Sequence, residues 1–189
     1  RQMCIRDRRI EEAVKEAITV LQGAENGWRM ELYPESERIY GGYTLFLKFN
    51  ADNTVVASSE NFAAGKTESS YYSVVAESGP VLAFDTNNDI IHFYSSPTTG
   101  AELGIGTSNG GLEGDSDFIV MEASADFVKL KGRKTNNYAY LYPIEAGVNW
   151  KTELQSYQDA AAKMDLIYTR CVVDGVAYPI DWEVRLNNF

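Results

Sequence analysis

Apolar residues recur with a helical period near the start of the chain. The spacing i, i+3, i+4, i+7, i+8 and i+11 is occupied by Ile10, Ala13, Val14, Ala17, Ile18 and Leu21. This spacing is typical of an amphipathic helix that buries one stripe. Glu11 and Lys15 form a favourable i,i+4 pair on the polar side, and Gly23 is suited to a C-cap. The pattern predicts a helix over residues 9–22.

From Trp28 to Tyr142 the period changes to two. In the segment 43–49, for example, apolar residues 43, 45, 47 and 49 share one face. Such one-sided alternation is typical of antiparallel sheets with one buried face. The expected strands are Trp28–Tyr33, Tyr43–Asn50, Thr54–Glu60, Ser70–Ala76, Val81–Phe84, Ile90–Tyr94, Asp117–Ala123, Asp126–Arg133 and Tyr138–Tyr142. A meander this long must hide its edges, so the predicted fold is mainly β, a lipocalin-like barrel or sandwich.

A turn at Thr135–Asn136 would define the last of these hairpins. It places Leu130 opposite Leu141 on the core side. On the other side it pairs three cations with three tyrosines: Arg133 with Tyr138, Lys131 with Tyr140, and Lys129 with Tyr142. Tyrosines that alternate with polar neighbours suit stacking against a sugar or another flat ligand, and ordinary cross-strand packing is the alternative. These six residues are the candidate ligand-binding residues.

A second hairpin is expected around Asn87–Asn88. Its register places Leu82 opposite Phe93. The same register makes His92, the only histidine of the chain, a cross-strand polar residue rather than a metal ligand or catalytic group.

Three other segments complete the predicted organisation. Residues 97–116 are glycine-rich and aperiodic, as long functional or mobile loops are. A helix over Trp150–Met164, with Asn149 as its N-cap, ends a first domain that spans residues 9–165. Residues 166–189 predict one more hairpin, around Asp174–Gly175, and are expected to begin a second, truncated region.

The first eight residues do not match the rest of the chain. Permitted codons for Arg1–Arg8 can spell a transposase sequencing adapter read through as coding sequence, and a basic N-terminal arm is the alternative. We expect the adapter, which would leave the natural N-terminus outside this chain.

Composition and charge exclude several classes of function. The chain of 189 residues is 44% hydrophobic and 23% charged, which is normal for a folded domain. Its 17 basic and 27 acidic residues give a net charge of −10, so binding to nucleic acid is not expected. One histidine and two cysteines leave little for a zinc site or histidine-based catalysis. We therefore predict no enzyme activity, no metal and no cofactor.

Acidic side chains offer two alternatives to that prediction. Glu113, Asp115 and Asp117 fit either a solvated acidic loop, which is the expectation, or a site for a hard cation. A carboxylate pair for hydrolysis stays open in a chain this acidic, although no spacing identifies one.

Several short blocks occur in the order in which they occur in one known family. They are Asn26-Gly27-Trp28, Tyr33-Pro34, Tyr40-Gly41-Gly42-Tyr43, Leu47-Lys48-Phe49, Gly79–Thr86 and Leu130–Lys134. From about residue 9 to its end, the chain resembles a Bacteroidota family of lipoproteins known as domain of unknown function 4302. Members of that family are about twice as long and carry a signal peptide with a lipidated cysteine before the first helix.

The resemblance implies an envelope lipoprotein near outer-membrane nutrient-uptake systems, with no established activity. Together with the tyrosines, it predicts a non-catalytic accessory protein that binds a glycan or a peptide for such a system. The membrane would be reached only through a lipid anchor missing from this chain. The alternatives are a structural or assembly subunit of an envelope complex and a carboxylate-based hydrolase.

Overall fold

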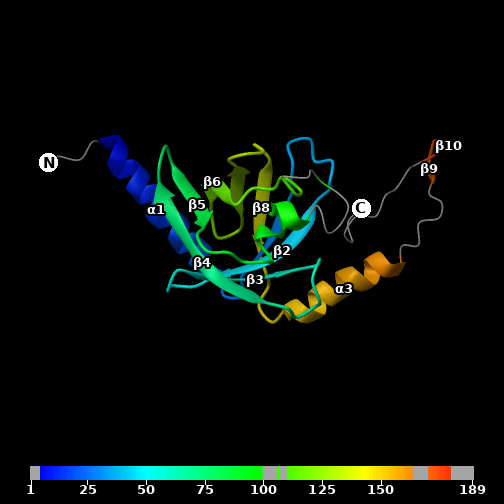
Figure 1. Cartoon of the computed structure of the whole chain (residues 1–189), viewed down its shortest axis with the longest axis horizontal. Helices are drawn as coiled ribbons and strands as arrows, with labels where there is room; N and C mark the ends of the chain where they lie inside the picture. The colour runs from blue at the N-terminus through cyan, green and yellow to red at the C-terminus, as the bar shows by residue number, and fades with distance from the viewer. Residues whose placement is uncertain (1–4, 100–105, 107–109, 164–169, 180–189) are drawn as a thin grey trace.

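The structure is a computed structural model that describes residues 5–99, 106, 110–163 and 170–179 (Figure 1). Its helices are α1 (Ile5–Gly23), the 3₁₀-helix η1 (His92–Tyr94) and α3 (Trp150–Lys163). Its strands are β1 (Trp28–Leu32), β2 (Tyr43–Phe49), β3 (Thr54–Ser59), β4 (Glu68–Ala76), β5 (Pro80–Phe84), β6 (Asp117–Ala123), β7 (Val128–Gly132), β8 (Tyr138–Pro143), β9 (Arg170–Val173) and β10 (Val176–Pro179).

Strands β1 to β8 form a closed antiparallel barrel in sequence order. β1 closes it, because Met30 lies opposite Leu45 of β2 on one side and opposite Leu141 of β8 on the other. The predicted lipocalin-like meander with a helix at each end is confirmed. The predicted C-terminal hairpin is also present: β9 and β10 form a separate two-stranded sheet. Asp174 and Gly175, which join them, both have positive φ, as a tight hairpin turn requires.

The inward faces of the strands form the core. Its largest fully buried side chains include Trp28, Tyr72, Tyr94, Met30, Leu45, Leu47, Leu82 and Leu130. An eight-stranded barrel has an interior that side chains can fill, and here aromatic rings occupy much of it. Phe49, for example, packs edge-on against Tyr72 at 4.8 Å between ring centroids and stacks on Phe84 at 6.5 Å.

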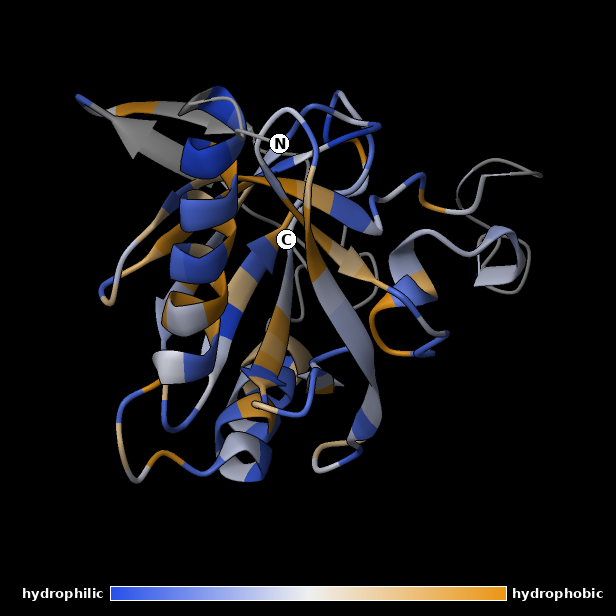
Figure 2. Ribbon diagram, turned by 90° about the vertical axis from the view of Figure 1, so that its left-hand side faces the viewer, coloured by the Kyte–Doolittle hydropathy of each residue, from blue (hydrophilic) through white to orange (hydrophobic). Residues whose placement is uncertain are grey.

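The helix α1 packs against β2, β4, β5 and β6. Its inner stripe buries Ala17 and Leu21, as the period predicts, while its outward side is mostly hydrophilic (Figure 2). Two hydrogen bonds attach its last turn to the barrel. The indole Nε1 of Trp28 donates to the Leu21 carbonyl at 2.8 Å, and Gln22 Nε2 donates to the Tyr72 hydroxyl at 2.8 Å.

The helix α3 covers the outer face of β2. There Phe46 is 1% exposed, and its ring meets Trp150 at 5.6 Å and Tyr157 at 6.3 Å between centroids. Asn149 caps the helix, because its Oδ1 accepts a hydrogen bond from the Thr152 amide at 3.1 Å. Met164, the predicted last residue, lies outside the described residues. Among the helices that the structure describes, none is long and apolar enough to cross a membrane.

The predicted strand Ile90–Tyr94 is wrong. These residues turn into η1, and β5 pairs instead with β6, where Leu82 lies opposite Phe118 rather than Phe93. The cause is Asn88, whose buried Oδ1 accepts hydrogen bonds from the amides of Ile90 and Ile91, both at 3.1 Å. Side-chain capping of this kind starts a helical turn and competes with strand pairing.

The predicted register of the β7–β8 hairpin is wrong by two residues. Leu130 lies opposite Ala139, Lys131 opposite Tyr138, and Lys129 opposite Tyr140. The connecting turn is longer than two residues, since Gly132 N donates to Asn137 O at 2.8 Å. A shift by an even number keeps every side chain on its face, so the predicted inward and outward sides hold.

Asp115 holds this longer turn. The sequence predicts a solvated carboxylate, but Asp115 is only 7% exposed. Its Oδ1 accepts the Lys134 amide at 2.6 Å, and its Oδ2 accepts the Thr135 hydroxyl at 2.5 Å. Gly132 is the residue that makes room for it, because a Cβ there would overlap Asp115 Oδ2.

We expect Asp115→Ala to destabilise the fold by about 2–4 kcal/mol, because it leaves buried donors of the turn without an acceptor. Chemical denaturation monitored by tryptophan fluorescence measures the change. Asp126→Ala is the matched control, since Asp126 is exposed, and its effect should stay within about 0.5 kcal/mol. Equal effects of the two substitutions would contradict the role given to Asp115.

Candidate functional site

Three tyrosines line the outer face of β8. Tyr138, Tyr140 and Tyr142 are partly exposed and alternate with the buried residues Ala139 and Leu141. The rings of Tyr140 and Tyr142 lie nearly parallel, at 15°, with centroids 6.4 Å apart. The predicted row of aromatic rings on one side of the hairpin is therefore present.

Two cations lie over these rings. Lys129 Nζ of β7 is 4.3 Å from the ring centroid of Tyr138 and 5.9 Å from that of Tyr140. Arg29 of β1 lies over Tyr142, with its Cζ 5.6 Å from the ring centroid. Arg29 was not among the predicted residues, because its neighbour Tyr142 reaches it only through closure of the barrel between β1 and β8. We call Lys129, Tyr138, Tyr140, Tyr142 and Arg29 the tyrosine face.

The other two predicted cations are placed differently. Lys131 lies between Tyr138 of β8 and Ile119 of β6, at the edge of the tyrosine face. Arg133 lies in the turn after β7, where its Nη1 pairs with Glu77 Oε1 at 3.0 Å. Four of the six predicted residues therefore lie together, namely Lys129, Tyr138, Tyr140 and Tyr142. Arg133 forms its ion pair with Glu77, away from these rings.

A cleft of about 350 Å³ extends the tyrosine face toward α3. Arg29 and Tyr142 form one wall, and Glu153 and Tyr157 of α3 form the other. The Tyr157 hydroxyl donates to Glu153 Oε1 at 2.9 Å, and burial raises the pKa of Tyr157. Arg29 Nε is buried and makes no hydrogen bond to the residues that the structure describes. The guanidinium of Arg29 faces Tyr157 across the cleft, where its hydrogen bond and its charge partly oppose the rise of the Tyr157 pKa.

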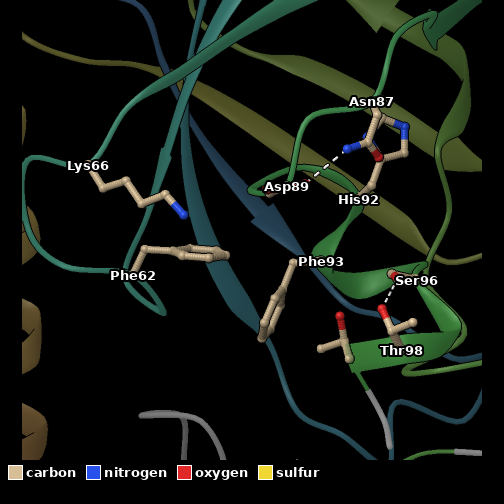
Figure 3. Close-up of a pocket in the computed structure, with 9 residues that line it drawn as sticks. Phe62, Lys66, Asn87, Asp89, His92, Phe93, Ser96 and Thr98 are labelled. Carbon is tan, nitrogen blue, oxygen red and sulfur yellow. Dashed lines mark hydrogen bonds between the residues drawn. The ribbon is translucent and has the colours of Figure 1, made fainter. Parts of the chain in front are cut away.

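A second candidate site lies at the end of the barrel where β3 leads into β4 and β5 leads into η1 (Figure 3). We call it the end pocket. It has a volume of about 330 Å³ and is lined by Phe62, Lys66, Asn87, Asp89, His92, Phe93, Ser96, Thr98 and Thr99. The rings of Phe62 and Phe93 meet edge to face at 5.2 Å, and Lys66 Nζ lies 4.3 Å from the Phe62 ring centroid.

Polar side chains surround these two rings. Asn87 Nδ2 donates to Asp89 Oδ1 at 2.9 Å, and the hydroxyls of Ser96 and Thr98 are 2.8 Å apart (Figure 3). His92, predicted to be a cross-strand residue, belongs to η1 instead, and its Nδ1 lies 3.1 Å from the Asn88 amide. The sequence does not predict this pocket, because the expected strand Ile90–Tyr94 gives no reason for His92 and Phe93 to lie beside Phe62 and Lys66.

Glu60 is a buried carboxylic acid next to the end pocket, and it is 7% exposed. Its Oε1 accepts the Thr44 amide at 2.8 Å, and its carbonyl accepts Gln158 Nε2 of α3 at 2.8 Å. Burial raises the pKa of Glu60 to about 7, although the Thr44 amide opposes the shift. The neighbouring Tyr94 is fully buried, and its pKa is raised by burial too. In the described part of the chain, no three His, Cys, Asp or Glu side chains gather as a metal site would require.

The comparisons with known proteins give a family and one similar structure. The sequence profile of the family described as domain of unknown function (DUF4302) matches residues 6–187, so the chain belongs to this family. The predicted membership in domain of unknown function 4302 is thereby confirmed. No curated protein matches the chain in sequence. A solved structure of japanin from Rhipicephalus appendiculatus, bound to cholesterol, is similar at 17% identity and a TM-score of 0.31, covering 84% of this chain and 95% of that one.

We expect Glu60→Gln to remove a pH dependence of stability. The pKa of Glu60 is raised from 4.5 to about 7 in the folded state. The contribution of this buried acid to the stability of the fold is therefore fully present below pH 4.5, and it is lost as the pH rises through 7. Between pH 4.5 and 7 the wild type should lose about 3 kcal/mol of unfolding free energy that the variant does not lose. Denaturation series between pH 4 and 8 measure this, and parallel pH profiles would contradict it.

Proposed function

We propose that the protein is a non-catalytic ligand-binding protein of the cell envelope, and that it binds a glycan or a peptide for an outer-membrane uptake system. The observation that carries the proposal is the tyrosine face. Three aromatic rings stand in a row on the outer wall of the barrel, with Lys129 and Arg29 over their faces.

The chemistry of this face suits such a ligand. A partly exposed tyrosine offers a flat apolar ring for stacking and a hydroxyl for hydrogen bonding at little cost in conformational entropy. Because β7, β8 and β1 are paired in the barrel, the rings are held in position before a ligand arrives, which lowers the entropy cost of binding. Arg29, whose side chain is 43% exposed, adds guanidinium donors at the end of the row.

The tyrosine face carries charges of both signs. The protein carries a net charge of −10, whereas the face presents Lys129 and Arg29 and is bordered by Lys131. Arg29 is partly balanced by Glu31, with 3.6 Å between Arg29 Nη2 and Glu31 Oε1. Glu31 also lies opposite Tyr140, and Glu122 of β6 lies opposite Lys129, so charges of both signs flank the rings. The hydroxyls of a glycan and the amides of a peptide both donate and accept hydrogen bonds, so they can pair with either sign.

The envelope location and the role in uptake rest on the resemblance to the lipoprotein family. A structural or assembly role would use the same face against another envelope protein. Co-purification of a stoichiometric protein partner in the absence of any glycan or peptide distinguishes that role from ligand binding.

We expect Tyr140→Ala and Tyr142→Ala each to weaken binding at least about tenfold, because each removes one ring of the stacked pair. The probes are panels of defined oligosaccharides and short peptides, and titration calorimetry measures affinity. Tyr140→Phe should keep most of the affinity, because it keeps the ring. Tyr71→Ala on β4 is the control, since Tyr71 is 56% exposed and lies outside the tyrosine face. Unchanged affinity in folded Tyr140 and Tyr142 variants would place the site elsewhere.

We expect the reading frame upstream of Arg9 in the source gene to encode a signal peptide with a lipid-accepting cysteine. Resequencing of the locus shows the frame, and palmitate labelling of the full-length protein followed by membrane fractionation checks the anchor. A cytoplasmic start that encodes Arg1–Arg8 would overturn both the adapter assignment and the envelope proposal.

A further inference from the structure

We propose that the end pocket is a second binding site and that it takes one neutral sugar ring, such as the terminal residue of a glycan. This inference deepens the proposed function by naming a ligand class, but it uses none of the residues of the tyrosine face. Three observations carry it: the two phenylalanine rings, the polar groups around them, and the balance of charge.

The aromatic wall of the pocket is the first observation. Phe62 and Phe93 come from different segments and meet edge to face at 5.2 Å (Figure 3). Both side chains pack against the core and stay partly exposed. The apolar face of a sugar ring packs on such a surface, because its C–H groups meet the electron-rich ring faces. A pocket of about 330 Å³ lies at the small end of the range for ligand sites, which fits a single ring better than a chain.

The polar groups are the second observation. Asn87, Ser96 and Thr98 can each donate and accept hydrogen bonds. In the structure they pair with one another or with Asp89, at 2.8 to 2.9 Å. Each of these pairs leaves further donors or acceptors on the same side chains for a ligand. Sugar hydroxyls both donate and accept, so a group of this composition complements them better than it complements an apolar or purely anionic ligand.

The charges are the third observation. Lys66 and Asp89 carry opposite charges on the pocket wall, and Glu68 lies next to them, with its Oε2 accepting the Asp89 amide at 3.1 Å. A phosphate or carboxylate entering the pocket would meet the Asp89 carboxylate as well as the single lysine of the lining. The lining therefore favours a ligand without net charge.

The pocket is built on a rigid support. Asn88 beneath it is fully buried and bonds Ser70 Oγ at 3.1 Å. Tyr94 of η1 is also fully buried, and its hydroxyl is 2.8 Å from Ser59 Oγ. The residues that face the ligand are thus placed before binding, as a specific site requires.

Titration with neutral methyl glycosides tests the inference. The probes are the glycosides of glucose, galactose, mannose, xylose and N-acetylglucosamine at millimolar concentration, followed by backbone amide NMR. We expect saturable shifts at residues of the end pocket for at least one probe. Asn87→Ala and Asp89→Ala, at exposed positions, should each weaken that binding at least about fivefold, and Phe93→Ala at least about tenfold. Tyr140→Ala should leave it unchanged.

The alternative outcomes separate this inference from the proposed function. If sugar binding is lost in Tyr140→Ala and kept in the three pocket variants, the end pocket is not the site, and the proposed function stands on the tyrosine face. If no probe gives saturable shifts in the end pocket, or if galacturonate binds there more tightly than methyl galactoside, the inference is overturned. A short peptide that binds in the pocket where no glycoside does would overturn it as well.

Discussion

The pairing of β1 with β8 is the constraint on which the rest of the structure depends. A meander of eight strands has two free edges, and each would expose a row of unpaired backbone groups. Closure pairs β1 on both sides, so that these edges disappear and the inward face becomes an enclosed core. Closure also brings Arg29 over Tyr142, although the two residues are 113 positions apart in the chain. One set of backbone pairs therefore builds both the core and the last contact of the tyrosine face.

A filled interior moves the candidate binding chemistry to the outside of the barrel. The inward side chains include large aromatic residues such as Trp28, Tyr72 and Tyr94, all fully buried. The tyrosine face and the end pocket instead use outward strand positions and the connections between strands. Strands hold side chains at fixed spacing, which suits an extended row of rings. Connections can enclose a small volume, which suits a pocket for one ring.

Local patterns in the sequence explain what could be predicted. The alternation along β8 assigns Tyr138, Tyr140 and Tyr142 to one side whatever the register, because a shift of two residues preserves faces. The register itself depends on Asp115, which lies about twenty residues before the turn that it holds. The η1 helix depends on the side chain of Asn88, which caps a turn where β-propensity favours a strand. Interactions of this kind, whether long-range or made by a single side chain, produce no hydrophobic period in the sequence, so the register and the η1 helix could not be predicted from it.

The two candidate sites are held by different parts of the molecule. The end of β3 supports the end pocket. The Ser59 hydroxyl is 2.8 Å from the Tyr94 hydroxyl. The backbone carbonyls of Glu60 and Phe62 both accept hydrogen bonds from Gln158 Nε2 of α3. The tyrosine face is held by different strands of the barrel, because its residues lie on β7, β8 and β1. Since the sites share no residue, substitutions in one should act independently of substitutions in the other. A glycan long enough to reach both would gain affinity from their linkage, whereas a short one would occupy a single site.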